Sequence, residues 1–474
     1  MPRSRSLVSL AVGCGLLAAS ALAVLAPVAS ATNVGSEAQL RAAFADLAET
    51  SITLSADISL TDCGSGDLFR DSAGVALTID GAGHTISQTC SGFRVMTTKG
   101  SGLTLHDLTV TGGNVEDGSG TGLGGGIYSA TSGPLVLDTT QVIDNSAGGS
   151  TGGLGGGFFA GGPVTLDHAV ISRNVSTGGT SIFGGLAGGF ASSGTVNATD
   201  TVISDNVAEG AVTGGGDAAG VFGNSDMTFV RSTISGNTTQ AGSTSGSGAT
   251  AGIAINANLT LVDSTVTGNS SQGPESSGGG IGAGGKITLV YSTVAGNSAA
   301  TNSANVSFDG PAGEDIAVGS VIADPLGGAP NCGGTVTTSQ GHNYDTDGTC
   351  GFANAVEGDT SSGSDPMLAP LADNGGSTQT MLPLSGSPLL DAIAPASCQD
   401  GAASGVSVDQ RGITRPQGAG CDIGAVEVEV AVTPTTSAPT PPPTTSPINA
   451  VSTTAPGTPA PPATPISGTP TYTG

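Results

Sequence analysis

The feature of this sequence that most constrains its fold is a repeat unit whose copies share a pattern but differ in many of their residues. One copy reads GGGIYSATSGPLVLDTTQVIDN over residues 124–145, and further copies close at residues 174, 206, 237, 269 and 297. Each copy opens on small residues, mostly glycines, and closes on an asparagine, and the closing positions lie 28–32 residues apart. A period of this length is typical of repeat architectures, in which each unit stacks on the next. We therefore expect an array of similar coils.

The pattern inside each unit indicates short β-strands. In the copy over residues 251–269, apolar residues alternate at Ile253 and Ile255 and again at Leu259 and Leu261, and a third run follows. Alternation with period two, bounded by Gly, Asn, Asp and Ser, predicts strands, and no helical pattern is present. One such coil cannot bury its inner face, so each strand must pair with its equivalent one coil away, at ~4.8 Å. The sequence thus predicts an all-β solenoid.

The closing asparagines are expected to form one column at a turn of the solenoid. Asparagine tolerates left-handed backbone geometry, and its amide can bond the amides above and below. This predicts a structural ladder of Asn145, Asn174, Asn206, Asn237, Asn269 and Asn297. Asn114 is expected to be an earlier member of the same ladder.

The first 31 residues have the three parts of a signal peptide: basic Arg3 and Arg5, an apolar run over residues 7–28, and a small-residue cleavage site at residues 29–31. No later stretch approaches the ~20 apolar residues that a transmembrane helix needs. We expect a mature chain that begins near Thr32 and is secreted or associated with the cell surface or cell wall.

The cysteines agree with an oxidising destination. Cys14 leaves with the signal peptide, and six cysteines, an even number, remain. Fifteen connectivities are possible, and pairing between sequence neighbours is the natural choice among them. It predicts three disulfides outside the repeats, as staples on the two ends: Cys63 with Cys90, Cys332 with Cys350, and Cys398 with Cys421.

The segments that flank the repeats are expected to cover the open ends of the solenoid, whose strand edges would otherwise join other chains. At the start, Ser36 and Gln39 form a capping box for a helix over residues 36–48, with Leu40, Ala43, Phe44 and Leu47 on one face. The expected division of the chain is a signal peptide (1–31), an N-terminal cap with the first rungs (32–76), β-helix repeats (77–312), C-terminal rungs with a disulfide-stapled cap (313–430) and a disordered stalk rich in Pro, Thr and Ser (431–474).

These phrases resemble a known group of proteins. LTIDGAGHTIS (77–87), followed by the GGGI and LTL coils, is similar to secreted right-handed parallel β-helix proteins of pectin-lyase-like fold. The repeats are also similar to those of polymorphic outer-membrane proteins, and residues 373–427 resemble the choice-of-anchor domain that closes many bacterial surface β-helix proteins. The resemblance implies a right-handed parallel β-helix and secretion or surface display. It brings no catalytic residue to this sequence.

Charge and loop composition argue against most enzymatic functions. The net charge of −26 disfavours nucleic acid and anionic membranes as partners. The segments between each asparagine and the next glycine run contain no Lys, Arg or His, whereas a lyase that acts on acidic sugars needs a base and cations. We expect a non-enzymatic protein of adhesion or cell-surface interaction. The alternative is a polysaccharide lyase or glycoside hydrolase.

A column of acidic residues after the second strand of each unit is the one candidate for a metal site. It would contain Asp107, Asp138, Asp167, Asp200 and Asp263, interrupted by Arg231 and Tyr291. Three interpretations compete: Asp capping a turn in water, carboxylates bridged by Ca²⁺, and a glycosidase-like carboxylate pair. The turn-capping interpretation is favoured. Asp138, Asp167 and Asp200 are the calcium candidates, and calcium is the only cofactor candidate.

Binding of a carbohydrate without chemistry is a further possibility. Its usual signature is stacked aromatic side chains, yet Trp is absent, and the phenylalanines in or beside the glycine-led strands are expected to fill the solenoid core. They are Phe158, Phe159, Phe183, Phe190 and Phe222. The expected partner is a cell-surface glycan or protein, and the expected oligomeric state is a monomer.

Overall fold

The computed structural model describes residues 31–429, apart from residues 72–74, 101, 118–119, 131, 180–183, 212–214, 243–247, 309–313, 353–355, 357 and 400. The expected signal peptide, except for Ala31, and the expected stalk lie outside the described residues. So does Phe183.

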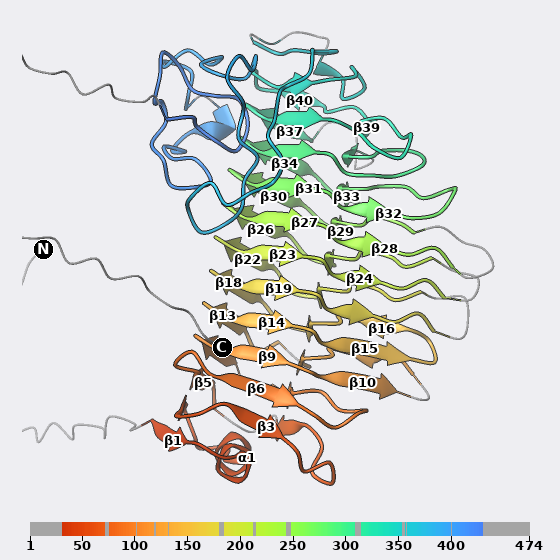
Figure 1. Cartoon of the computed structure of the whole chain (residues 1–474), viewed down its shortest axis with the longest axis vertical. Helices are drawn as coiled ribbons and strands as arrows, with labels where there is room; N and C mark the ends of the chain where they lie inside the picture. Colours follow the sequence, from red (N-terminus) through yellow and green to blue (C-terminus); the bar gives the residue numbers. More distant parts are fainter. Residues whose placement is uncertain are drawn as a thin grey trace, which may run out of the picture. The chain divides into compact units, whose positions relative to one another are not determined.

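The described chain is a parallel β-solenoid, as the repeats predicted (Figure 1). Three long sheets run along it, and all their strand pairs are parallel. The 12-stranded sheet contains β1 (Thr32–Val34), β2 (Ser51–Leu54), β5 (Leu77–Asp80), β8 (Leu103–His106), β13 (Leu135–Asp138), β18 (Val164–Asp167), β22 (Val196–Thr199), β26 (Met227–Val230), β30 (Leu259–Val262), β34 (Ile287–Val290), β37 (Ile316–Val318) and β40 (Thr338–Ser339). The 11-stranded sheet contains β3 (Ile58–Leu60), β6 (Thr85–Gln88), β9 (Thr109–Thr111), β14 (Gln141–Ile143), β19 (Val170–Ser172), β23 (Val202–Ser204), β27 (Thr233–Ser235), β31 (Thr265–Thr267), β35 (Thr293–Ala295), β38 (Val321–Ala323) and β41 (Tyr344–Asp345). The 10-stranded sheet contains β4 (Leu68–Arg70), β7 (Met96–Thr98), β12 (Ile127–Ser129), β17 (Phe158–Ala160), β21 (Phe190–Ser192), β25 (Val221–Gly223), β29 (Ile253–Ile255), β33 (Ile281–Ala283), β36 (Val306–Phe308) and β39 (Cys332–Gly334).

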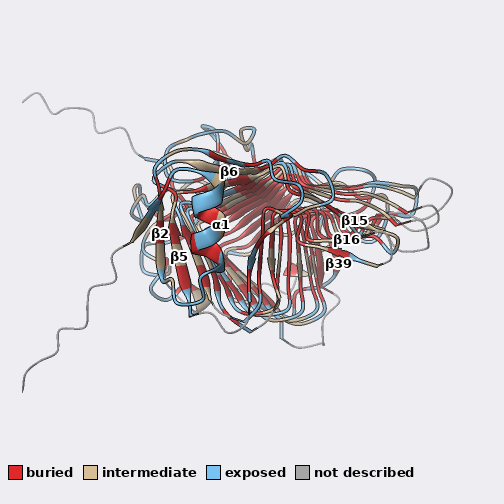
Figure 2. Ribbon diagram, turned by 90° about the horizontal axis from the view of Figure 1, so that it is seen from below, coloured by how far each residue is buried: buried red, intermediate tan, exposed pale blue. Residues whose placement is uncertain are grey.

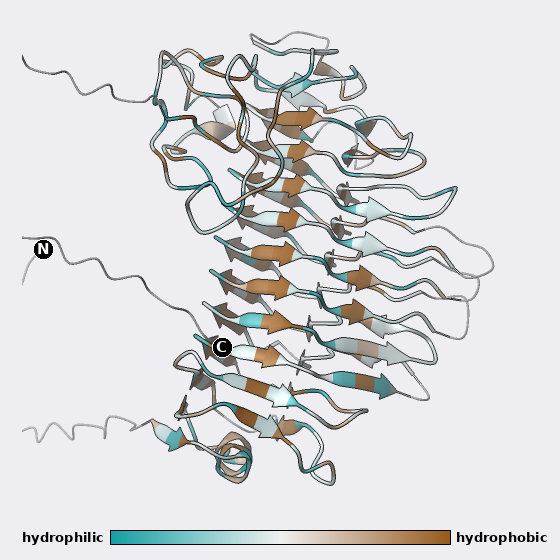
Figure 3. Cartoon of the chain, viewed as in Figure 1, coloured by the Kyte–Doolittle hydropathy of each residue, from teal (hydrophilic) through white to brown (hydrophobic). Residues whose placement is uncertain are grey.

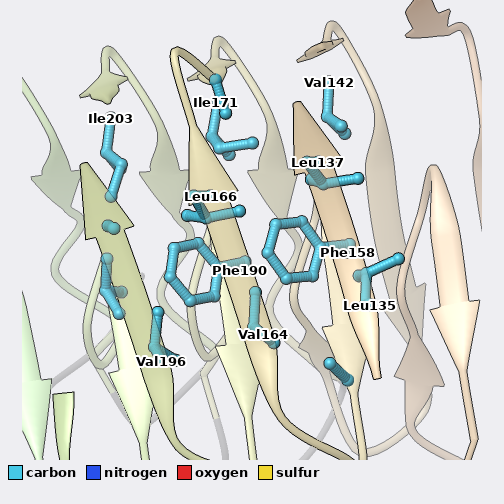
Figure 4. Packing of buried hydrophobic residues seen from close by; sticks show 14 of the residues in the cluster. Leu135, Leu137, Val142, Phe158, Val164, Leu166, Ile171, Phe190, Val196 and Ile203 are labelled. Atoms are coloured by element: carbon cyan, nitrogen blue, oxygen red, sulfur yellow. The ribbon is translucent and has the colours of Figure 1, made fainter. Parts of the chain in front are cut away.

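Equivalent apolar residues meet in rows inside the solenoid. Leu135 pairs in register with Leu103 on one side and Val164 on the other, and all three side chains are buried. Figure 2, seen along the solenoid, shows the buried residues gathered within the three sheets. Figure 3 shows hydrophobic positions recurring at the same place in successive strands. The rings of Phe158 and Phe190 stack in this interior with centroids 4.5 Å apart (Figure 4).

The asparagines form a continuous buried ladder. The backbone N–H and the Nδ2 of Asn145 both donate to Oδ1 of Asn174, at 3.0 and 3.1 Å. Asn174 donates to Asn206 in the same way, at 3.0 and 3.1 Å. The pattern repeats up to Asn297, and each amide also donates to a backbone carbonyl of the preceding rung, as Asn206 does to Ile171 at 2.9 Å. The amides therefore satisfy one another where water has no access.

The glycine runs are part of the same construction. A Cβ on Gly157 would lie 2.6 Å from the carbonyl oxygen of Gly189 and 3.0 Å from the amide of Asn174. Gly280 has the same relation to Asn297. The asparagine of a rung occupies the space beside the glycine that enters the 10-stranded sheet, so the two residue types recur together.

The left-handed position of this turn is the residue before the ladder, not the asparagine. Asp144, Arg173 and Asp205 have φ values of 56°, 55° and 56°, and the ladder asparagines have no positive φ. The expected member Asn114 is also misplaced, because it pairs with Ser146, one position beyond the ladder. Gly113 takes its place and donates its N–H to Oδ1 of Asn145 at 2.9 Å.

The ladder extends beyond the repeats. Asn297 donates to Asn305 at 2.8 Å, Asn305 to Asn331 at 2.7 Å, and Asn331 to the carboxylate of Asp345 at 2.8 Å. These steps span 8, 26 and 14 residues, so the regular period could not reveal them.

A second polar ladder lies at the turn between the 12- and 11-stranded sheets. The N–H of Thr201 donates to Oγ of Ser232 at 3.2 Å, and the N–H of Ser232 donates to Oγ of Ser264 at 3.1 Å. Ser292 and Ser320 make the same contact at 3.1 Å. Sequence reasoning missed this ladder, since Ser and Thr are common throughout the chain.

The segments after each ladder asparagine are more ordered than the loops expected there. They form a fourth, six-stranded parallel sheet, which projects to one side of the three long sheets (Figures 1 and 2). Its strands are β10 (Asn114–Asp117), β15 (Ser146–Gly149), β20 (Val175–Ser176), β24 (Val207–Ala208), β28 (Thr238–Thr239) and β32 (Ser270–Ser271). A two-stranded sheet of β11 (Gly122–Leu123) and β16 (Gly153–Leu154) lies beside it.

Helix α1 (Glu37–Ala45) covers the first rungs (Figure 2). Ser36 is its N-cap and accepts from the N–H of Gln39, and Leu40, Ala43 and Phe44 are buried. The helix is shorter than expected, and Leu47 lies beyond it, 36% exposed. The fully buried guanidinium group of Arg70 donates to backbone carbonyls around the end of the helix, including those of Phe44, Asp46, Leu47 and Glu49.

The three disulfides expected from neighbour pairing are present, but not all of them staple an end. Cys63–Cys90 lies near the first rungs and Cys332–Cys350 near the last. Cys398–Cys421 instead belongs to residues 365–429, which we call the flank segment. This segment contains the 3₁₀ helix η2 (Gly401–Ala403) and runs alongside the rungs (Figure 1).

Side-chain contacts dock the flank segment on the 11-stranded sheet. Gln410, 1% exposed, accepts from Oγ1 of Thr265 at 2.6 Å and donates to Oγ1 of Thr233 at 2.8 Å. The hydroxyl of Tyr291 donates to the carbonyl of Cys398 at 2.8 Å. Over this part of the chain, the segment that was expected to cap the end of the solenoid instead covers its side.

Candidate functional site

The expected aspartate column does not exist as one row. Asp138 pairs with His106 and Asp167, at the last position of each strand. Asp167 pairs with Thr199, so Asp200 stands one position later. It shares that later position with Asp107 and Asp263, and all three have left-handed φ values of 45° to 51°. A one-residue offset turns a side chain in another direction, so Asp200 does not continue the row of Asp138 and Asp167.

Two of these aspartates, Asp167 and Asp200, nevertheless meet with His168 between two rungs. Nδ1 of His168 lies 2.7 Å from Asp167 Oδ1, and its Nε2 lies 3.9 Å from Asp200 Oδ2. One ligand atom from each residue falls within 4.8 Å of the other two. This is the one group of at least three potential metal ligands among the described residues. The histidine was not foreseen as a partner, because no metal-ligand spacing in the sequence pointed to it.

The cation Arg231 lies beside this cluster. Its Nε and NH2 donate to the two oxygens of Asp200, at 3.0 and 2.7 Å. The Asp200 side chain is 10% exposed, whereas those of Asp167 and His168 are about half exposed. Asp200 therefore already has a cation on both oxygens, while His168 lies within hydrogen-bond distance of Asp167. A similar pair, His106 and Asp138 at 2.7 Å, lies further toward the N-terminal rungs.

Asp263, the next acidic residue at this turn, has a structural role. Asp263 lies under the flank segment, 3.2 Å from the buried guanidinium of Arg415, which also contacts Glu427 at 3.1 Å. The same guanidinium lies 4.3 Å from the ring centre of Tyr291. Burial raises the pKa of Asp263 to about 7, against the opposing attraction of Arg415. The contact of Arg415 with Asp263 thus binds the flank segment to the rungs.

The phenylalanines divide between two faces. Phe158 and Phe190 fill the core, as expected. Phe159 and Phe222 do not, because each stands next to an inward residue of its strand and so points to the outer face of the 10-stranded sheet. The sequence pattern FF and VF contained this alternation, and the expectation that every phenylalanine is internal was wrong for these two.

Comparisons with known proteins found a similarity over the first part of the chain alone. Residues 31–130, which span α1 and the strands up to β12, are similar to the family described as a putative pectate lyase-like adhesive domain. No curated protein matches the chain. No solved structure matches it either. No described helix is long and apolar enough to cross a membrane. The fold and this match agree on a β-solenoid whose N-terminal part is similar to an adhesive domain.

Proposed function

We propose that this chain is an exported, non-enzymatic β-helix protein that is displayed at the cell surface or secreted and that acts in adhesion. The observation that carries the proposal is the similarity of residues 31–130 to a putative pectate lyase-like adhesive domain, on a chain whose strands up to β41 form one continuous solenoid. Three disulfides support export, because such bonds persist in oxidising compartments.

The test of adhesion uses particles coated with the full chain. We expect saturable retention of these particles on live cells, with competition by the soluble protein. Particles coated with the same protein after reduction and unfolding are the matched control, since they keep the composition and net charge. Retention equal to that of the control would contradict the proposal.

The enzymatic alternative has one specific place to be tested. The cluster of Asp167, His168 and Asp200 has acid–base groups and a neighbouring cation, Arg231. We expect no new reducing or unsaturated ends when the protein is incubated with a polysaccharide panel, with or without Ca²⁺. If the wild type releases such ends and Asp167→Asn or Asp200→Asn does not, the adhesive proposal is wrong and the protein is an enzyme that acts at this cluster.

A further inference from the structure

The outer face of the 10-stranded sheet carries a row of residues, half of them aromatic, that we call the aromatic row. Its members hold the middle, outward position of β4, β7, β12, β17, β21, β25, β29 and β33, and each pairs in register with the next. In order they are Phe69, Thr97, Tyr128, Phe159, Ala191, Phe222, Ala254 and Gly282.

The aromatic row differs from the corresponding row of the neighbouring sheet. It contains four aromatic rings, three small residues and one threonine, and no charged residue. The outward row of the 12-stranded sheet is mainly Thr and Asn over the same rungs, as at Thr165, Asn197 and Thr228. The core does not require aromatic rings here, because the inward neighbours Phe158 and Val221 are already fully buried.

The rings remain accessible to a ligand. Phe69 is 45% exposed, and Tyr128, Phe159 and Phe222 are partly exposed. Tyr128 and Phe159 lie with centroids 5.8 Å apart, tilted by 47°. A contiguous set of partly exposed rings on one face of a sheet is a surface feature that marks interaction sites.

Two neighbouring cations, Arg94 and Lys99, stabilise the first rings of the row, and the guanidinium group of Arg94 is itself paired. Arg94 lies 5.1 Å from the centre of Tyr128, donates to the carbonyl of Leu123 at 2.6 Å and contacts Asp67 at 3.5 Å. Lys99 lies 5.1 Å from the centre of Phe69. With a net charge of −26 on the whole chain, this surface favours an uncharged partner over a polyanion.

The spacing of the row sets the shape of that partner. Strands one rung apart are separated by ~4.8 Å. Tyr128 and Phe159 are one rung apart, whereas Phe69 and Tyr128, and likewise Phe159 and Phe222, are two rungs or about 10 Å apart along the row. An extended β-1,4-linked polysaccharide is straight, and its two-sugar repeat has this length. Its sugar rings present C–H faces that pack on aromatic rings. An α-1,4-linked chain coils and cannot follow the row.

From these observations we propose that the aromatic row binds an uncharged, β-1,4-linked polysaccharide that lies along the solenoid axis. The inference rests on the proposed adhesive function and names its ligand class. The binding involves no covalent step.

The test measures depletion of the full-length protein by microcrystalline cellulose, an insoluble β-1,4-glucan, with starch granules as the α-1,4-linked comparison. We expect binding to cellulose that exceeds binding to starch. Phe159→Ala and Phe222→Ala are each expected to weaken it about fivefold, and the double variant by more than tenfold. Leu384→Ala is the matched control, because Leu384 is an apolar residue of the flank segment and is 47% exposed. It should bind as the wild type does.

Thermal unfolding of each variant separates a lost ligand contact from a lost fold. No binding to cellulose by the wild type, equal binding to starch, or full binding by the folded double variant would each overturn the inference. The cell-retention assay distinguishes failure of this inference from failure of the proposed function. If the double variant is still retained on cells, the adhesive function is supported, but the aromatic row is not its cause.

Discussion

The guanidinium group of Arg415 contacts the carboxylate of Asp263 at 3.2 Å, although 152 residues separate the two in the chain. Both side chains are almost completely buried, at 0% and 4% exposure. This ion pair joins the flank segment to a turn of the solenoid.

At a pH above about 7, where Asp263 is ionised, replacing Arg415 by methionine should destabilise the protein by about 3 kcal/mol, because Asp263 and Glu427 would stay buried without their cation. Urea unfolding gives the free energy. Arg173→Ala removes an exposed pair with Asp144 and should cost less than about 1 kcal/mol. Equal effects of the two substitutions would show that burial of the Arg415 pair has no energetic consequence.

The raised pKa of Asp263 predicts a dependence of stability on pH. Its pKa is about 7 in the folded protein, against 3.8 ordinarily, so between these values the folded state holds a proton that the unfolded state has released. The free energy of unfolding should therefore fall as the pH rises from about 4 to about 7 through this residue. The difference between wild type and Asp263→Asn isolates the effect. A difference that is constant across this range would contradict it.

Glu37 predicts the opposite dependence at acidic pH. Its pKa is lowered to about 2, since hydrogen bonds from Thr61, Asp62 and Arg41 outweigh its desolvation. Its stabilisation is complete above about 4.5 and is lost as the pH falls toward 2. For a side chain that is 17% exposed this is on the order of 2 kcal/mol. Acid unfolding of Glu37→Gln should begin from a lower stability and show a shallower decline than the wild type.

The asparagine ladder predicts a large cost for one broken step. Asn206→Leu should destabilise the protein by about 3 kcal/mol, because Asn174 and Asn237 each lose a buried partner. Asn256→Ala is the control: its Nδ2 donates to Asn224 at 2.9 Å, but this pair is exposed. Chemical unfolding should show a change below about 0.5 kcal/mol there. Similar losses in both variants would mean that burial does not govern the strength of these amide contacts.

Calcium is expected to bind the cluster of Asp167, His168 and Asp200 only weakly, since Arg231 already contacts both oxygens of Asp200. A calcium titration followed by calorimetry should give no saturable heat below about 1 mM. Arg231→Ala frees the carboxylate and is the informative comparison. Tight binding by the wild type that disappears in Asp167→Asn would contradict the expectation and restore calcium as a ligand.

The sequence was sufficient for the architecture because each rung repeats the same alternation, glycine run and asparagine. It also contained the disulfide pairs, since neighbouring cysteines in the chain lie on neighbouring rungs or on one short segment. The aspartate register was also present in the sequence but was easily overlooked there. Asp167 and Asp200 occupy positions four and five of the corresponding strand segments, VTLDH and VNATD, and the strand pairing makes this offset plain.

The position of the flank segment was equally hidden from the sequence. Its contacts with the rungs, such as Gln410 with Thr265 and Arg415 with Asp263, join residues about 150 apart that share no periodic signal. The outward direction of Phe159 and Phe222 was, by contrast, available from strand alternation and was obscured only by the general preference of phenylalanine for the core.

The lateral docking of the flank segment also determines how the protein responds to mechanical load. A pull on the chain beyond residue 429 first reaches the contacts of Val428 with Asp422 and of Glu427 with Asp409. It then reaches the contacts of Ala425 with Thr293 and of Gly424 with Gly319, which join the flank segment to the solenoid before its last rung. A stacked solenoid loaded at its final rung would peel one coil at a time. Because the flank segment contacts several rungs, at Thr233, Thr265 and Thr293 among others, we expect tension from the C-terminal side to act on these rungs together and not on the last strand alone.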